Sequence, residues 1–246
     1  MLQENPLISI IVAVYNGENT IQRCINSVHK QTYKNKELII IDGNSSDKTL
    51  EIIKNNEEKI DFFVSEPDYG IADAWNKGIK KSKGDWILFL GCDDELYSED
   101  SLEKLSPYLN HQYDIVTGKI QLIDNKGNGI KVLGDKWNWS KFRTKMSIPH
   151  QATLHSKKLF EEFGLFDPNF KLVADYELLL RKKDKLKALF IDQIISNMQI
   201  GGVSQREVIK VWKEWSQAQK KHEVMHNLLI SILLKWRTLK YYIKTY

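Results

Sequence analysis

The stretch SIIVAVYNGENTIQRCINSVHKQTYKNKELIIIDGNSSDKT, residues 9–49, contains two hydrophobic runs with an amphipathic segment between them. Each run is nearly continuous in apolar residues, which is typical of a parallel strand that helices cover on both faces. Between the runs, four apolar residues recur at the spacing of one helix face: Ile21, Cys24, Ile25 and Val28. This order of strand, helix and strand predicts a βαβ unit with a right-handed crossover.

The same alternation continues to about residue 100. We expect four further elements, namely a helix from residue 49, a strand over DFFVSE (61–66), a helix over 71–79 and a strand over DWILFL (85–90). In a parallel sheet, ligands bind at the carboxyl ends of the strands. Polar residues end three of the predicted strands, so they are expected to line one crevice: residues 13–16, 42–43 and 92–94.

The second half of the chain is less regular. Two strands are expected on either side of the turn NKGNG (125–129), and a loop follows over 137–149. Helices are expected near 157–163, from about 175 and from 204 to the end. The sequence therefore predicts an α/β fold with a mostly parallel central sheet and a C-terminal helical extension.

Composition limits the classes of function. The formal net charge is +4, and the four basic residues after Glu223 account for all of it: Lys235, Arg237, Lys240 and Lys244. A neutral body with a basic tail argues against a nucleic-acid binder, which carries positive charge across a face or groove. The only cysteines, Cys24 and Cys92, suit a reducing compartment, and the first apolar run follows Glu4 rather than basic residues, unlike a secretory signal. A cytoplasmic location is therefore expected.

The fourth predicted strand runs directly into two adjacent carboxylates, Asp93 and Asp94. Such neighbouring negative charges repel each other at the end of a buried segment, unless a cation lies between them and a substrate. Mg²⁺ prefers one or two protein carboxylates together with substrate phosphate oxygens. The pair therefore fits a metal ion and a phosphorylated ligand, and the alternative is a solvated turn.

Asp42 ends the second strand, and residues 45–47 (Ser-Ser-Asp) stand before the next helix. These three are typical helix-capping residues, so an ordinary N-cap is their expected role. A cap does not account for Asp42, whose carboxylate could accept a hydrogen bond from the imide N–H of a uracil ring.

Together these motifs resemble the nucleotide-binding half of a family 2 glycosyltransferase with the GT-A fold. The resemblance covers residues 9–49 and EPDYGIADAWNKGIKKSKGDWILFLGCDDEL (66–96), and it continues more weakly in HQATLHSKKLFEEFGLFDPNFKLVADYELLLR (150–181). It implies a GT-A domain over 1–203, with a nucleotide-binding half (1–100), an acceptor-binding half (101–203) and a helical extension over 204–246.

The resemblance also implies roles for residues of the nucleotide-binding half. It assigns the base to Asp42, the ribose to Asp93 and a Mg²⁺ or Mn²⁺ ion to Asp94. Such an ion neutralises charge on the leaving nucleoside diphosphate. Three residues at the end of the first strand would line the nucleotide: Ala13, Tyr15 and Glu18.

In the helix after DYG, Trp75 stands where many family members have Arg, and its place on the apolar stripe predicts a core residue. The diphosphate thereby loses one cation, and Lys77 is expected to be solvated rather than to replace it. Asp73 and Asn76 lie off the apolar stripe and are candidates for contacts with the donor sugar.

On the acceptor side, the family's general base is the Asp of a Glu-Asp pair that follows a GxFD segment. Here GLFD is 164–167, and the base would be Asp175, which deprotonates the acceptor hydroxyl in an inverting transfer. The Glu of the pair is replaced by Ala174, and Asp175 could equally cap its helix. By resemblance His150 and Gln151 lie beside the diphosphate and acceptor, although a lone His is as often structural.

The segment NLLISILLKWRTLKYYIK (227–244) is apolar but interrupted by Lys235 and Arg237. It is too short to span a bilayer, which takes about 20 apolar residues. Two readings stay open: a terminal helix packed on the body, and an interfacial helix with basic and aromatic residues at the lipid headgroups. The concentrated positive charge favours membrane contact.

Residues and resemblance together predict a metal-dependent inverting glycosyltransferase that uses a UDP-sugar. Its expected acceptor is a hydroxyl of a glycan or polyprenyl-linked glycan at the inner face of the cell membrane, in capsule, lipopolysaccharide or exopolysaccharide assembly. Two alternatives stay open, a non-catalytic protein that binds nucleotide-sugars or membrane, and a sugar nucleotidyltransferase. The latter needs a Gly-rich basic loop after its first strand, whereas VYNGENTIQ (14–22) has one Gly and no Lys.

Overall fold

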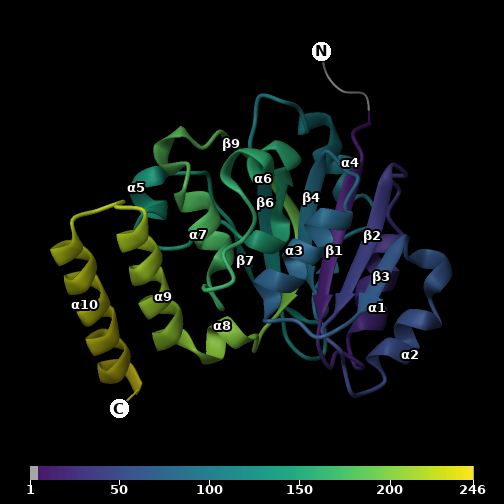
Figure 1. Cartoon of the computed structure of the whole chain (residues 1–246), viewed down its shortest axis with the longest axis horizontal. Coiled ribbons are helices and arrows are strands. Elements are labelled where there is room, and N and C mark those ends of the chain that lie inside the picture. Colours follow the sequence, from purple (N-terminus) through teal and green to yellow (C-terminus); the bar gives the residue numbers. More distant parts are fainter. Residues whose placement is uncertain (1–4, 246) are drawn as a thin grey trace.

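A nine-stranded mixed sheet forms the centre of the molecule (Figure 1). The computed structural model describes residues 5–245, with side chains up to Ile243. Strand order along the sheet is β3-β2-β1-β4-β8-β6-β9-β5, and β7 pairs with β6 at its side.

The first half of the chain folds as the predicted series of βαβ units. Its elements are β1 (Ile8–Val14), α1 (Ile21–His29), β2 (Lys36–Asp42), α2 (Thr49–Lys54), β3 (Phe62–Ser65), α3 (Ile71–Lys81) and β4 (Trp86–Gly91). The four strands are parallel, and their register aligns Val14 with Asp42, Ala13 with Gly91 and Asp42 with Ser65. The carboxyl ends of all four strands therefore meet at one edge, as predicted.

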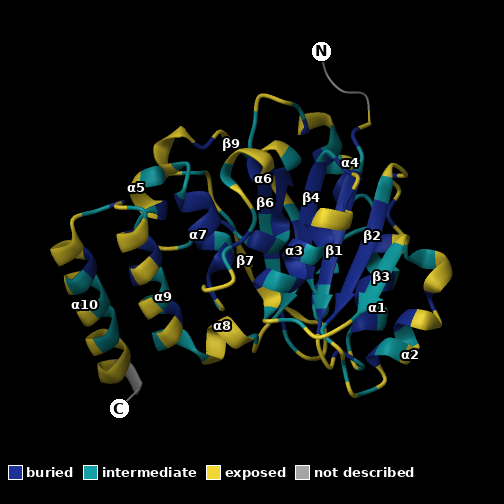
Figure 2. Ribbon diagram, viewed as in Figure 1, coloured by how far each residue is buried: buried dark blue, intermediate teal, exposed yellow. Residues whose placement is uncertain are grey.

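Two apolar cores enclose this sheet, one on each face. Along β1, Ile11 belongs to the core that includes α3, whereas Ile10 and Val12 belong to the core that includes α1. Because side chains alternate between the faces of a strand and both faces are covered, the strands need continuous apolar runs. Figure 2 shows β1, β2 and β4 as the most continuously buried part of the molecule.

The second half extends the sheet with mixed pairing. Its elements are β5 (Glu95–Leu96), α4 (Ser101–Leu105), β6 (Ile115–Ile123), β7 (Gly129–Leu133), α5 (Trp139–Phe142), β8 (Thr153–Ser156), α6 (Lys157–Phe163), α7 (Ala174–Leu180) and β9 (Ala188–Gln199). The predicted strands β6 and β7 and the predicted helix α6 are present. The twelve-residue strand β9 was not predicted, because its mixed composition gives no clear period and its strand state comes from parallel pairing with β6.

Three helices complete the chain: α8 (Val203–Arg206), α9 (Val208–Lys221) and α10 (Asn227–Thr245). Helix α9 packs against α7, with Val211 and Ala218 in the same core as the buried residues of α3. The Gln219 side chain on α9 donates a hydrogen bond to the Tyr176 hydroxyl on α7 (3.0 Å). Helix α10 lies outside α9 at one end of the molecule (Figure 1). Among the described residues, no helix is long and apolar enough to cross a membrane.

Candidate functional site

The loops that follow β1 and β2 are joined by hydrogen bonds at the carboxyl edge of the sheet. The Asn16 backbone N–H donates to the Ser45 hydroxyl (2.8 Å), and the Asn16 side chain accepts from the Ser46 N–H (2.9 Å). The Gly17 N–H donates to the Thr49 hydroxyl (2.8 Å). The N-cap of α2 is Lys48, without a side-chain capping bond, so the serines connect two loops instead of capping a helix.

Of the three residues predicted to line the nucleotide, Tyr15 and Glu18 lie on the first of these loops and Ala13 lies near the end of β1. Ala13 is half-buried within β1, and Tyr15 is 65% exposed just beyond it. The Glu18 carboxylate accepts from the backbone N–H of Lys48 (3.0 Å), which ties it to the second loop. Tyr15 therefore offers an open aromatic surface, whereas Glu18 has one oxygen engaged by the protein.

Asp42 is fully buried at the end of β2, and its carboxylate is held by two serines. It accepts hydrogen bonds from the Ser65 hydroxyl (2.5 Å) and from both the hydroxyl (2.5 Å) and the backbone N–H (3.1 Å) of Ser45. These contacts join the ends of β2 and β3. Asp42 thus lies at the predicted edge, but beneath the surface rather than open to a ligand.

A second carboxylate, Asp68, lies beside Gly43, the residue after Asp42, and was not singled out from the sequence. It lies 2.6 Å from the position that a Cβ at Gly43 would take, and the Tyr15 ring lies 3.5 Å from the same position. Asp68 and Tyr15 therefore flank Gly43 together. The sequence carried a signal for this residue, since the segment 66–70 directly follows the third strand, whose end was left out of the predicted crevice.

Asp93 and Asp94 converge beside Gly91 at the end of β4. Oxygens of the two carboxylates lie 2.6 and 2.9 Å from the position that a Cβ at Gly91 would take, so a side chain there would displace them. Asp94 is 2% exposed. Its burial and the charge of Asp93 raise the pKa of Asp94 to about 8, although hydrogen bonds from the Gly91 and Gln199 backbone and the Gln151 side chain oppose the shift.

Within residues 5–245, no group of three or more His, Cys, Asp or Glu side chains is arranged as a complete metal site. Two neighbouring carboxylates without a third protein ligand suit Mg²⁺ or Mn²⁺ that takes further ligands from a diphosphate. The raised pKa of Asp94 agrees with this fit, because a bound cation would relieve the unfavourable charge of a buried carboxylate beside another.

The segment Pro149–Gln151 links this acidic pair to Asp175. Gln151 bonds Asp94, while the neighbouring His150 places its Nδ1 atom 4.0 Å from a carboxylate oxygen of Asp175. The His150 ring is 6% exposed and stacks on Phe89 (5.2 Å between centroids). Burial and the nearby His155 hold its pKa well below 6.5, so His150 is neutral at physiological pH.

Asp175 lies in the first turn of α7, on the acceptor side of the predicted crevice. One carboxylate oxygen accepts the backbone N–H of Tyr176 (2.8 Å), and the other faces His150. Burial raises the pKa of Asp175 to about 6 against the effect of the Tyr176 hydrogen bond. The N-cap residue of α7 is Val173, so Asp175 is not the cap. A carboxylate with this pKa is mostly ionised at pH 7 and suits general-base chemistry.

Residues of α3 have mainly structural contacts. Trp75 is in the core as predicted, 4.7 Å from the His150 ring. The Asn76 amide donates to the Phe166 carbonyl (2.8 Å) and accepts from the Phe166 N–H (2.9 Å), which engages both ends of the amide. Asp73 accepts from the Tyr69 N–H and lies 3.6 Å from the Lys77 ammonium.

Lys77 was expected to be solvated but is bound on three sides. Its ammonium contacts Glu66 (2.9 Å), Asp73 (3.6 Å) and the Pro67 carbonyl (2.8 Å). Lys77 therefore stabilises the loop that carries Asp68, and its charge is already matched by two carboxylates.

Arg23 of α1 contacts the backbone of the acidic pair and was not identified from the sequence. Its guanidinium donates to the Asp93 carbonyl (2.7 Å) and to the Gln199 side chain (2.8 Å), and it lies 3.4 Å from Glu95. Arg23 also lines a hollow of about 560 Å³ between α1 and β5. Only the fold brings α1, β4 and β9 together, so sequence spacing gave no signal.

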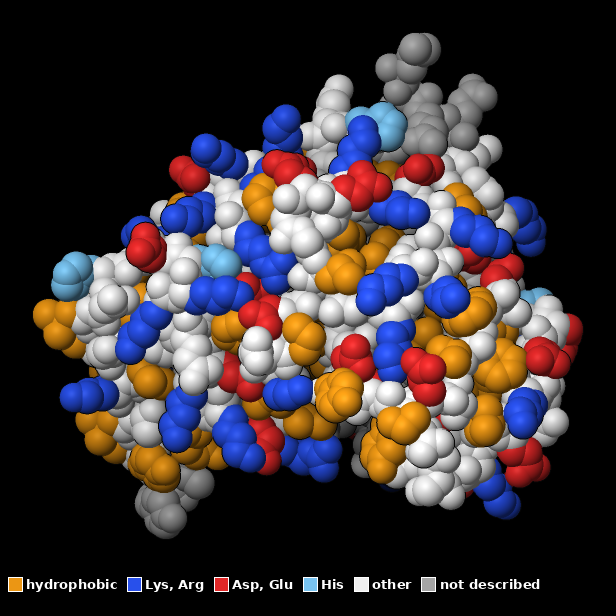
Figure 3. Space-filling model, in the orientation of Figure 1, with side chains coloured by type: hydrophobic (Ala, Val, Ile, Leu, Met, Phe, Trp, Pro, Cys, Tyr) orange, Lys and Arg blue, Asp and Glu red, His pale blue; other side chains and the backbone are white. Residues whose placement is uncertain are grey.

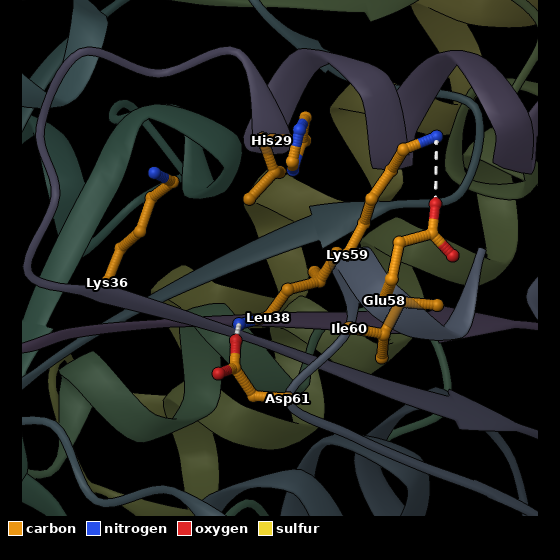
Figure 4. A pocket seen from close by; sticks show the side chains of 8 residues that line it. His29, Lys36, Leu38, Glu58, Lys59, Ile60 and Asp61 are labelled. Carbon is orange, nitrogen blue, oxygen red and sulfur yellow. Dashed lines mark hydrogen bonds and ion pairs between the residues drawn. The ribbon is translucent and has the colours of Figure 1, made fainter.

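A smaller hollow of about 200 Å³ lies at the opposite edge of the sheet (Figure 4). It is lined by the end of α1 and the beginnings of β2 and β3, where Asp61 accepts the Leu38 N–H (2.8 Å). Because ligands of parallel sheets bind at the carboxyl ends of strands, this hollow is not part of the candidate site.

Comparisons with known proteins agree with this architecture. The family model described as glycosyl transferase family 2 matches residues 9–159. The PGL/p-HBAD biosynthesis glycosyltransferase of Mycobacterium bovis is 28% identical over 214 residues, covering 83% of this chain and 82% of the relative. An uncharacterized glycosyltransferase of Rickettsia typhi is 36% identical over 185 residues, covering 71% of this chain and 58% of the relative.

Solved structures show the same fold at low sequence identity. S. aureus TarS in complex with UDP-GlcNAc has a TM-score of 0.68 and 16% identity, covering 93% of this chain and 70% of that one. The mannosyltransferase PcManGT of Pyrobaculum calidifontis, in complex with GDP-Man and Mn²⁺, has a TM-score of 0.71 and 14% identity, covering 94% and 70%. Because the family model matches more than half of the chain, this protein belongs to glycosyl transferase family 2 and is a glycosyltransferase with the GT-A fold.

Proposed function

We propose that the chain is a metal-dependent inverting glycosyltransferase that moves a sugar from a UDP-sugar to a hydroxyl group of a lipid-linked glycan. One observation carries the proposal: the Pro149–Gln151 segment contacts Asp94 through Gln151 and Asp175 through His150. A site for a charged leaving group thus adjoins a carboxylate suited to accept a proton.

Asp93 would hold the ribose and Asp94 the metal. When bound, Mg²⁺ or Mn²⁺ supplies positive charge that neutralises the leaving diphosphate. The protein's contribution is a carboxylate pair with Arg23 bound to the Asp93 carbonyl and Gln151 to the Asp94 carboxylate, and glycine at position 91 leaves room for both carboxylates. The Mn²⁺ in the complex of PcManGT supports a divalent ion here.

The base of the nucleotide would stack on Tyr15 and meet a carboxylate at the ends of β2 and β3. We assign the direct contact to Asp68, beside Gly43, and a supporting role to Asp42, whose oxygens are held by Ser45 and Ser65. One Asp68 oxygen already accepts the Gly70 N–H (2.8 Å), so the other oxygen suits the one imide N–H of uracil, whereas guanine presents two adjacent N–H groups that would need both oxygens. Ala13 and Glu18 would complete this wall.

On the acceptor side, Asp175 would take the proton from the attacking hydroxyl. A single displacement inverts the anomeric centre and needs one such base rather than a nucleophile. The neutral His150 imidazole lies against Asp175 without adding charge. The pKa of Asp175 is therefore set mainly by its burial. Gln151 and Asp73 are the candidates for contact with donor hydroxyls, while Asn76 would act through the Phe166 backbone.

A bacterial surface polysaccharide, such as capsule or lipopolysaccharide, is the acceptor class that we favour, built at the inner face of the cell membrane. The exposed apolar and basic surface of α10 supports an acceptor carried on lipid. A sugar nucleotidyltransferase is disfavoured by family membership and by a first loop without the basic residues that a triphosphate needs.

Calorimetric titration with UDP, GDP and dTDP, with and without Mn²⁺, tests the donor site without an acceptor. We expect UDP to bind most tightly, and only in the presence of Mn²⁺. Asp94→Asn should abolish the Mn²⁺-dependent binding of UDP, whereas Asp68→Asn should weaken UDP binding and leave its dependence on Mn²⁺ unchanged. The matched control Asp61→Asn removes an exposed carboxylate from the hollow at the opposite edge of the sheet and should bind as the wild type does. Absence of binding to all three nucleotides by the folded protein would refute the proposal.

A further inference from the structure

Helix α10 presents apolar residues on two opposite faces, and only one of them is covered by protein. The inner face packs toward α9: Ile230 is 1% exposed, and the Tyr241 ring lies 5.9 Å from the Trp212 ring. Arg237 also turns inward, where it donates to the Thr144 carbonyl (2.7 Å) and lies 5.5 Å from the Trp215 ring. Arg237 was expected at the lipid headgroups, but it contacts the body of the protein instead.

The outer face is a continuous apolar stripe, called here the outer stripe. Its members are each between 51% and 70% exposed: Leu228, Leu229, Ile232, Trp236, Leu239 and Ile243. From Leu228 they recur at steps of three and four residues, so they share one side of the helix over more than four turns. Figure 3 shows hydrophobic side chains interspersed with Lys and Arg over the end of the molecule where Figure 1 places α10. Exposed apolar stripes of this extent mark interaction surfaces.

Positive charge borders the outer stripe on both sides. At about 100° per residue, Lys235 and Lys240 fall on opposite flanks of the stripe. The Lys240 ammonium lies 4.9 Å from the Trp236 ring centroid, which lets the ammonium stay at the rim while its stem covers the indole. No acidic residue follows Glu223 in the chain. The surface is therefore apolar along its axis and cationic along both edges.

We infer that the outer stripe is the membrane-docking surface of the protein and that it lies in the interface of a membrane rich in anionic lipid. The stripe would enter the headgroup and acyl boundary, while Lys235 and Lys240 meet lipid phosphates. A second copy of the chain fits the surface less well. Two outer stripes packed together would bring lysines close to lysines, with no acidic side chain on the helix to pair with them.

This surface is distinct from the donor site, so vesicle binding tests it without reference to catalysis. The experiment is sedimentation of the full chain with vesicles that contain phosphatidylglycerol, compared with vesicles of phosphatidylcholine alone. We expect binding to the anionic vesicles that weakens as salt is added. A variant with Ile232→Ser, Trp236→Ser and Leu239→Ser should bind at least about tenfold more weakly, because it removes most of the buried apolar area.

Two matched controls separate the outer stripe from general surface effects. Ile130→Ser, Val132→Ser and Leu133→Ser remove three exposed apolar residues of β7 and should leave vesicle binding unchanged. Lys235→Gln with Lys240→Gln should lower binding to anionic vesicles on the order of tenfold, whereas Lys126→Gln with Lys131→Gln should not. Circular dichroism confirms that each variant is folded, and calorimetry checks that UDP affinity is retained.

Three results would overturn the inference. One is equal binding by the outer-stripe variant and the β7 variant, and another is failure of the wild type to bind anionic vesicles. The third is a wild-type dimer, measured by light scattering, that becomes a monomer in the outer-stripe variant, since a second copy would then cover the surface. Loss of UDP binding alone would count against the proposed reaction and leave this inference intact.

Discussion

At the scale of single residues, the candidate site has two carboxylates with raised pKa values, the buried Asp94 and the partly buried Asp175. Burial raises both, and in Asp94 the neighbouring Asp93 adds to the shift, whereas Asp175 has only a neutral imidazole nearby. At neutral pH Asp94 is therefore largely protonated, whereas Asp175 is mostly ionised. The two environments suit one residue to metal binding and the other to base chemistry.

The first prediction concerns the stability of the metal-free protein. Asp94 has a pKa of about 8 in the folded protein, whereas its ordinary value is 3.8. Between pH 3.8 and about pH 8, the folded state therefore binds one more proton at this residue than the unfolded state does. Stability then falls as pH rises through that window, and Asp94→Asn should unfold at a higher temperature than the wild type at pH 8 to 9 but not at pH 4. Scanning calorimetry in a chelating buffer measures this. Added Mn²⁺ should stabilise the wild type only, and an equal gain in both proteins would contradict the metal assignment.

The second prediction concerns Asp175 in a transfer assay. Asp175→Asn should lower kcat by about 10²- to 10⁴-fold while UDP affinity stays unchanged, because general-base catalysis contributes on that order. In the wild type, kcat/KM should fall as pH drops through about 6, where Asp175 becomes protonated. Asp184→Asn is the control, since it removes an exposed carboxylate just beyond the same helix. If Asp175→Asn transferred sugar at the wild-type rate, Asp175 would not be the general base.

At the scale of elements, a buried charge cluster ties the helix that carries Asp175 to α9. Glu177 of α7 is fully buried and bonds Arg181 of its own helix, together with Lys221 (2.8 Å) and His222 (2.7 Å) at the end of α9. Burial alone would raise the pKa of Glu177, but hydrogen bonds from these three residues hold it at about 2. The position of α7, and hence of Asp175, depends on a helix that follows it by some thirty residues.

The third prediction tests this connection. Glu177→Gln leaves three donors around an uncharged side chain, and removing one partner of a buried pair costs about 3–5 kcal/mol. The free energy of unfolding, measured in urea, should fall by that amount. Glu207→Gln breaks an exposed pair with Lys210 within the same C-terminal region and should change it by less than about 1 kcal/mol. Similar values for the two variants would mean that the cluster does not anchor α9.

At the scale of the whole molecule, the C-terminal helices divide into a part of the core and an outer layer. Helix α9 supplies Val211 and Ala218 to the core and bonds Tyr176 through Gln219. Helix α10 lies beyond it, with most of its side chains exposed (Figure 2). The structure thus separates a body that ends near His226 from a surface helix.

The fourth prediction follows from this division. Deletion of residues 227–246 should leave a folded protein with unchanged UDP affinity, because most of the described side chains of α10 are exposed. Deletion from residue 208 should abolish cooperative unfolding, since it uncovers the apolar core against α7 and leaves Glu177 without two of its partners. Thermal unfolding of both truncated chains provides the measurement. A stable, nucleotide-binding protein without α9 would show that the body ends before residue 208.

Local pattern determined the first half of this protein. Continuous apolar runs predicted β1, β2 and β4, and helical spacing predicted α1. The acidic pair was placed at the end of a strand. These predictions were possible because a strand that is buried on both faces needs consecutive apolar residues, a pattern visible in the local sequence. The resemblance supplied Asp175. Tertiary structure alone decided that Gln151 reaches Asp94, that His150 lies against Asp175, that Asp68 lies beside Gly43 and that Arg237 faces inward. These contacts join residues that are distant in sequence. They depend on how strands pair and helices pack, and the local pattern of apolar residues does not determine that packing.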